Sequence, residues 1–180
     1  TGVAIPGTRI APTTAHSIAS INQLAPGRVF LGIGTGHTAM RVMGQDPMGI
    51  RDFREYLRVV RALLNGEAVD YTYNGKTTEI VWQNHGDKFR NIEDPIPIYV
   101  AGNGPLALKT AGMYGDGLVS LFNEQKDVLE YHLDMVKQGA DKIDRALPSN
   151  FHTTTLTNAV VLKPGETLTS ERVIERAASW

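Results

Sequence analysis

The sequence predicts an α/β fold in which helices cover a parallel β-sheet. Segments with strand-type and helix-type hydrophobic patterns alternate along the chain, an order typical of βαβ units. The segment at residues 28–34 is a continuous apolar run, as expected of a parallel strand that is covered on both faces. The chain has 180 residues, 42% of them hydrophobic, which is enough for one domain with its own core.

The first elements are predicted from residues that typically start or end helices and strands. Residues 1–6 have the composition of a strand end that runs into a turn. A helix is predicted over residues 12–24, because Pro12 suits a first helical turn and Pro26-Gly27 breaks the pattern. The predicted buried face of this helix carries Ala15, Ile18, Ala19 and Asn22.

The middle of the chain combines a clear helix with a hairpin. Residues 36–50 show no period and predict a loop or short helical pieces. A helical stripe of apolar residues follows over residues 50–65, where Asn65-Gly66 closes it. Residues 67–95 predict an inserted β-hairpin, because Asn74-Gly75 separates two β-favouring runs.

Regular alternation resumes after this insertion. The predicted elements are a strand at residues 96–100, a helix at 104–112, a strand at 117–121, a helix at 125–140, a strand at 151–162 and a helix at 170–178. The predicted apolar face of the long helix at 125–140 carries Leu129, Leu133, Val136 and Ala140. About five strands therefore alternate with helices, and residues 1–180 are expected to form a single domain.

Two closures of the sheet are compatible with this pattern. One is an open doubly wound sheet, and the other is a (β/α)8 barrel, or TIM barrel. A complete barrel typically needs about 250 residues. A chain of 180 residues that includes an insertion can form only part of one.

Charge and composition exclude several classes of protein. The chain carries 18 Lys and Arg against 19 Asp and Glu with no long basic run, so neither nucleic acid nor an anionic membrane is expected as a partner. Without cysteine the sequence cannot supply a disulfide framework, a thiolate metal site or a cysteine nucleophile. No apolar run approaches the roughly 20 residues that span a bilayer, so we expect a soluble, cytoplasmic protein.

Small residues cluster at residues 6–9, 32–37 and 101–105, where predicted strands end and α/β proteins place their chemistry. The second cluster lacks the third glycine of a dinucleotide fingerprint, which argues against a Rossmann site. In the third cluster, the backbone amides of residues 102–104 precede a predicted helix and predict a seat for an anion such as phosphate. A plain tight turn is the alternative at each cluster.

Three motifs occur in a fixed order in the first two thirds of the chain. They are residues 1–12 (TGVAIPGTRIAP), residues 26–36 (PGRVFLGIGTG) and residues 97–105 (PIYVAGNGP), the last followed by Ala111-Gly112 and Gly115-Asp116-Gly117. Together they resemble the bacterial-luciferase-like oxidoreductase superfamily, in particular its methylenetetrahydromethanopterin-reductase-like branch. The resemblance covers most of residues 1–121. It implies a (β/α)8 TIM barrel of which this chain, as a fragment, supplies about five strands.

The resemblance also implies a cofactor at the carboxyl ends of the strands, either FMN or the F420-type 8-hydroxy-5-deazaflavin. The implied activity is monooxygenation or hydride transfer on a small organic substrate. Carried over to this sequence, a bulge with a non-proline cis peptide falls at Gly2-Val3. The residues implied to bind the cofactor are Gly2, Val3, Ala4, Thr35, Gly36, Ala101, Gly102, Asn103 and Gly104, with Thr1 beside them.

His37 is the candidate catalytic residue. It stands where the resemblance places an acidic proton donor in the deazaflavin branch, and an imidazole can serve as a general acid near neutral pH. A surface-loop histidine is the alternative reading. The other histidines lack metal-ligand spacing and are predicted to be structural, so no metal site is expected; they are His16, His85, His132 and His152.

Several further expectations depend on the same resemblance. The full-length protein is expected to form a homodimer, and a separate flavin reductase is a possible partner. Arg9 follows a strand end, and this position predicts either binding of substrate or phosphate or a role in helix capping or a salt bridge. Trp82 and Tyr73 in the hairpin segment either wall a substrate pocket or form an aromatic minicore. The alternative function is a non-catalytic binding or subunit role of a truncated barrel.

Overall fold

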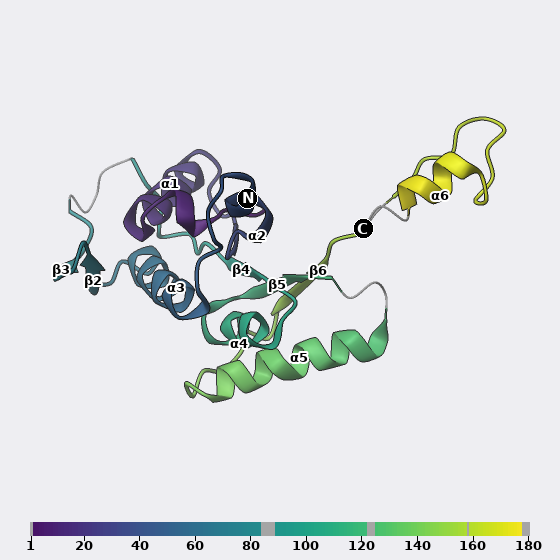
Figure 1. Ribbon diagram of the computed structural model, residues 1–180. Helices are drawn as coiled ribbons and strands as arrows, with labels where there is room; N and C mark the ends of the chain where they lie inside the picture. Colours follow the sequence, from purple (N-terminus) through teal and green to yellow (C-terminus); the bar gives the residue numbers. More distant parts are fainter. Residues whose placement is uncertain (1, 84–88, 122–124, 158, 178–180) are drawn as a thin grey trace.

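A four-stranded parallel sheet forms the centre of the computed structural model, which describes residues 2–83, 89–121, 125–157 and 159–177 (Figure 1). Its strands are β1 (Leu31–Gly34), β4 (Ile98–Ala101), β5 (Gly117–Ser120) and β6 (His152–Thr155). They lie in the order β1-β4-β5-β6, and each neighbouring pair is parallel. A doubly wound sheet reverses its strand order at a switch point. This sheet follows chain order throughout, so the closure adopted is the arc of an incomplete barrel.

The segment before the first helix extends this arc by one more strand position. Ala4 forms a parallel bridge with Ile33. The Ala4 amide donates to the carbonyl of Gly32 at 2.7 Å, and its carbonyl accepts from the amide of Gly34 at 3.2 Å. The predicted strand end at the start of the chain is therefore confirmed, and it runs into the short 3-10 helix η1 (Pro6–Thr8).

Helices form an outer layer that also follows chain order. Helix α1 (Ala11–Leu24) packs on α3 (Ile50–Leu64), α3 packs on α4 (Pro105–Tyr114), and α4 packs on α5 (Lys126–Asp141). The core between helices and sheet contains fully buried side chains from both, including Ile33, Phe53, Leu57, Ile98, Val100 and Leu118. Figure 1 shows the short α6 (Glu171–Ala177) standing apart from this body.

The predicted face of α1 is confirmed, because Ala15, Ile18, Ala19 and Asn22 are all buried. The expectation for α5 is partly wrong. Leu133, which was predicted on the apolar face, is 39% exposed, and the buried position next to it is taken by His132, a residue predicted to be structural but not assigned to that face.

The physical reason lies in the packing of α5 on α4. A Cβ atom on Gly112 of α4 would lie 1.8 Å from the carbonyl oxygen of Val136, and one on Gly139 of α5 would lie 2.0 Å from that of Lys109. The two backbones therefore touch at these glycines. This contact sets the rotation of α5 about its axis and turns His132 toward the sheet.

Residues 69–80 form a two-stranded antiparallel hairpin of β2 (Val69–Tyr73) and β3 (Lys76–Ile80). Its turn residues Asn74 and Gly75 have φ of 50° and 77°, as a type I′ turn requires. Trp82 packs against the ring of His16 and donates to a carbonyl of α3, so it belongs to an aromatic contact and not to a cavity wall near the strand ends. The status of this hairpin as an insertion stays a prediction.

All four predicted strands of the main sheet are shorter in the structure, and two of them lose three residues or more. The run at residues 28–34 contributes only Leu31–Gly34 to the sheet, and the segment at 151–162 contributes only His152–Thr155. A further short helix, α2 (His37–Val42), occupies the segment expected to hold a loop or helical pieces. Within the described ranges, no helix combines the length and apolar character needed to cross a membrane.

Candidate cofactor site

The carboxyl ends of all four parallel strands border one cavity of about 710 Å³. The described segment before η1 also reaches it through Val3. Of the residues predicted for the site, the cavity is lined by Val3, Thr35, Gly36, His37, Ala101, Gly102, Asn103 and Gly104. Gly2 and Ala4 do not line it, Ala4 because its backbone pairs with β1. Thr1 and His85 lie outside the described residues.

The peptide bond between Gly2 and Val3 is cis, as the resemblance implied. Val3 is 42% exposed and its side chain borders the cavity. A Cβ atom on Gly2 would meet nothing within 4 Å. An apolar side chain thus borders the cavity on this side, which suits a flat ring.

Close backbone packing shapes the end of β1. A Cβ atom on Gly34 would lie 3.2 Å from the Cβ of Ala101 on the neighbouring strand. Gly36 has a φ of 87°, a conformation that favours glycine, and its carbonyl accepts from the amide of Met40 at 2.8 Å. This sharp turn starts α2 and places the exposed His37 beside the cavity.

The anion seat predicted at the end of β4 needs a correction. The amide of Gly102 donates to the carbonyl of Val119 at 3.0 Å, so it belongs to the sheet and has no proton left for a ligand. In the part of the chain that the structure describes, the amides of Asn103, Gly104 and Leu106 have no protein acceptor. The open donors therefore lie one residue further along, at the N-terminus of α4. Parallel pairing with β5 is the physical reason, because it extends one residue beyond the strand.

Charge around this helix end favours an anion. The first turn of α4 contains no acidic residue. Arg54 of α3 donates from Nε to Oγ1 of Thr110 at 2.9 Å and from its terminal nitrogen to the carbonyl of Leu106 at 3.3 Å. Its guanidinium thus adds positive charge to the positive end of the helix dipole. A Cβ atom on Gly104 would meet nothing within 4 Å, so the space above these amides is open.

The sequence reasoning missed several residues of the cavity wall. They are Gly34, Thr38, Ala39, Ala107, Val119, Ser120, Leu121 and Leu156. Ser120, Leu121 and Leu156 follow from the same strand-end rule when it is applied to β5 and β6 as well as to the glycine-rich ends. Asn103 connects two of these ends, because its Oδ1 accepts from Ser120 Oγ at 2.8 Å and from the Leu121 amide at 2.7 Å.

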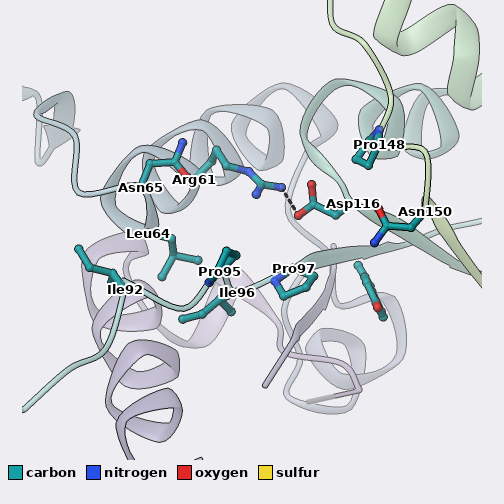
Figure 2. A pocket seen from close by; sticks show the side chains of 11 residues that line it. Arg61, Leu64, Asn65, Ile92, Pro95, Ile96, Pro97, Asp116, Pro148 and Asn150 are labelled. Atoms are coloured by element: carbon teal, nitrogen blue, oxygen red, sulfur yellow. Dashed lines mark hydrogen bonds and ion pairs between the residues drawn. The ribbon is translucent and has the colours of Figure 1, made fainter. Parts of the chain in front are cut away.

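A second cavity of about 430 Å³ lies near the amino ends of the strands (Figure 2). Its wall includes an ion pair between Arg61 and Asp116 at 2.6 Å. Asp116 also pairs with Arg145 at 3.0 Å and accepts from the amide of Ile98 at 2.9 Å. Through these contacts the Asp116 carboxylate connects the starts of β4 and β5 to α3 and to the segment after α5. Stabilising contacts of this kind are typical of the amino-terminal face of a barrel.

The fold and the site thus define a barrel-type α/β protein with a glycine-lined cavity at the carboxyl ends of its strands. The cavity lies beside a helix N-terminus whose first amides have no acceptor among the described residues, an arrangement typical of anion sites in such folds. Comparison with known families agrees with this class. Residues 1–173 match the model of the luciferase-like monooxygenase family. The chain belongs to this family.

Two curated relatives are similar to most of the chain. The F420-dependent glucose-6-phosphate dehydrogenase of Beutenbergia cavernae is 32% identical over 160 residues, which cover 82% of this chain and 44% of that protein. The 5,10-methylenetetrahydromethanopterin reductase of Methanolobus tindarius is 33% identical over 149 residues, which cover 81% and 43%. The chain thus spans less than half the length of these relatives.

Among solved structures, the coenzyme F420-dependent tetrahydromethanopterin reductase from Methanopyrus kandleri matches with a TM-score of 0.69 and 25% identity. The match covers 87% of this chain and 48% of that one. Together with the strand order, it confirms the prediction that the chain supplies part of a barrel.

Proposed function

We propose that the protein to which this chain belongs is an oxidoreductase that exchanges hydride with a small organic substrate by means of an F420-type deazaflavin. The observation that carries this proposal is the cavity at the strand ends, where the amides of Asn103, Gly104 and Leu106 have no acceptor among the described residues. The names of two similar proteins, an F420-dependent dehydrogenase and an F420-dependent reductase, support a deazaflavin and hydride transfer.

The residues present fit such a cofactor. When bound, the deazaflavin supplies the centre that gives or takes the hydride. The chain supplies placement: Val3 would face the ring, Thr35 and Gly36 would border its polar chain, and the α4 amides would donate to its phosphate. Charge-assisted hydrogen bonds of this type contribute roughly 1.5–3 kcal/mol each.

His37 is assigned the proton transfer that accompanies hydride exchange. It is exposed at the first position of α2 and borders the same cavity as Val3 and Asn103. An imidazole nitrogen there can donate a proton to a substrate oxygen or accept one from it. The carbon skeleton of the substrate is not specified by these residues.

The test is a titration of the full-length protein with FMN and with the F420-type deazaflavin, each followed by absorbance. We expect the deazaflavin to bind at least about tenfold more tightly, a difference of about 1.4 kcal/mol. If FMN binds more tightly, the proposed reaction becomes monooxygenation instead of hydride transfer, and a separate reductase must supply the reduced FMN. Binding of neither would support the alternative, a non-catalytic subunit. Cytoplasmic location and a homodimer remain part of the proposal.

A further inference from the structure

His132 is a buried base that the proposed function does not use. It lies in the middle of α5 with 4% of its surface exposed, and its Nδ1 is 3.0 Å from Oγ of Ser120. Ser120 ends β5, is 2% exposed and borders the cavity. Burial lowers the pKa of His132 below its ordinary value of 6.5, so the imidazole is neutral at physiological pH.

The hydrogen bonds from this histidine run in one direction. The amide of Leu121 can only donate, so the Asn103 atom that lies 2.7 Å from it is the side-chain oxygen. Ser120 Oγ lies 2.8 Å from the same oxygen and gives it its single proton. Ser120 can then only accept from His132, which therefore carries its proton on Nδ1.

This chain of donors fixes the carboxamide of Asn103. Its oxygen is held toward the end of β5 by two donors, so Nδ2 lies on the opposite side of the group. The two Nδ2 protons have no acceptor among the described residues, and Asn103 borders the cavity. They are additional donors next to the open amides of Asn103 and Gly104.

We propose that His132 and Ser120 are positioning residues that hold the Asn103 carboxamide so that Nδ2 donates to the anionic group of the bound cofactor. The inference rests on the proposed function, because it needs an anion at the N-terminus of α4. The close contact of α4 with α5 at Gly139 supports it. This contact lies two turns after His132 on the same buried face and fixes how near His132 comes to the sheet.

The experiment compares ligands with and without phosphate on the full-length protein. FMN is paired with riboflavin, and 8-hydroxy-5-deazariboflavin 5′-phosphate with 8-hydroxy-5-deazariboflavin. For each pair, the Kd of the phosphate-free ligand divided by the Kd of the phosphorylated ligand measures how much the phosphate contributes to binding. His132→Leu and Ser120→Ala break the donor chain, Asn103→Asp replaces Nδ2 by an oxygen of similar size, and His132→Asn keeps a donor near Nδ1.

We expect His132→Leu and Ser120→Ala to reduce this ratio roughly 3- to 10-fold, the value of one lost hydrogen bond. Asn103→Asp should reduce it roughly 10-fold or more, because a carboxylate repels phosphate. His132→Asn should restore the wild-type ratio, and affinity for the phosphate-free ligands should not change. A merely structural role of His132 would weaken both members of a pair equally.

Two results overturn the inference in different ways. If the wild type prefers the phosphorylated ligand and Ser120→Ala keeps that preference, the positioning role is wrong and the anion seat stands. If the wild type binds both members of each pair equally, the anion seat itself is wrong. Thermal denaturation identifies a variant that does not fold, and Ser120→Ala with Asn103→Asp carries the test if His132→Leu is such a variant.

Discussion

Gly102 and Gly104 stand two positions apart at the end of β4, but their missing side chains have different consequences. A Cβ atom on Gly102 would lie 2.4 Å from the Cβ of Ala107, so this glycine allows α4 to approach the strand. Gly104 has a φ of −80°, which any residue can adopt, and a Cβ there would meet only open space. Gly102 therefore serves packing, and Gly104 keeps the cavity open above the α4 amides.

These two glycines give a matched pair of substitutions. Gly104→Val should weaken cofactor binding about tenfold with little change in thermal stability, because the new side chain occupies the anion seat. Gly102→Val should lower the free energy of unfolding by about 2 kcal/mol through overpacking. Ligand titration and thermal denaturation of both variants separate the two effects. Equal losses of stability would contradict the assignment of Gly104 to the cavity.

A second prediction at the scale of residues concerns His37. His37→Asn should lower kcat roughly 100-fold, the usual contribution of a general acid, and leave the cofactor Kd unchanged. His16→Asn is the matched control, because His16 lies on the exposed side of α1 away from the cavity. Steady-state kinetics of the two variants decide the matter. If the kcat of His37→Asn equals that of the control, His37 is a surface-loop histidine without a catalytic role.

At the scale of elements, the contact between α4 and α5 depends on two glycines. Gly112→Ala should lower the free energy of unfolding by about 3 kcal/mol, because the new Cβ would overlap the carbonyl of Val136 and the helices must separate. Gln138→Ala on the exposed side of α5 is the control and should change stability by less than about 0.5 kcal/mol. Urea denaturation measures both. A neutral Gly112→Ala would show that α5 can move without cost.

The amino ends of the strands depend on a different contact. Asp116 is only 21% exposed and joins Arg61, Arg145 and the amide that starts β4. Asp116→Ala should lower the free energy of unfolding by about 2 kcal/mol, because two partly buried guanidinium groups lose their counter-ion. Exposed Asp46→Ala is the control for a lost surface carboxylate. Cofactor affinity should survive in both variants, since this cluster lies at the other end of the sheet from the anion seat.

The whole molecule is an arc with two unlike faces. Leu31 and Ile98 point toward the helices and are buried. On the other face, the ring of Tyr99 on β4 stacks on Phe30, just before β1, at 4.8 Å. It also stacks on His152 of β6 at 5.2 Å, across Gly117 of the intervening β5. Phe30 is 41% exposed. In a closed barrel this aromatic row would lie inside, which agrees with a chain that covers less than half of its relatives.

The stability of the whole fold should depend on pH through His132. Burial lowers its pKa in the folded state below 6.5, so the unfolded chain binds more protons in the window below that value. The contribution to stability is fully present above pH 6.5 and is lost as the pH falls through the folded-state pKa. Urea denaturation at pH 7.5 and pH 5.5 should show a larger loss for the wild type than for His132→Asn, which cannot titrate there. Equal losses would contradict this.

Much of the secondary structure and part of the candidate site could be predicted from local patterns. The stripe of α3, the buried face of α1 and the Asn74-Gly75 turn follow from spacing and turn chemistry alone. The glycine-rich ends of β1 and β4 predicted nearly half of the cavity wall. Ser120 was missed because no unusual composition marks the end of β5. His132 was missed because its burial depends on how α5 rotates against α4.

Amino-acid order alone determines which segments become strands and helices here, because hydrophobic period, glycine and proline act within a few residues of one another. Only the folded chain decides which strands become neighbours. The observed strand order excludes a doubly wound sheet. Because β4 pairs with β5, the Gly102 amide donates to the Val119 carbonyl, and the amides without an acceptor among the described residues are those of Asn103 and Gly104 and the one after Pro105. The fold also brings His132 to Ser120, because contacts between distant segments depend on how whole elements pack, which no local pattern specifies.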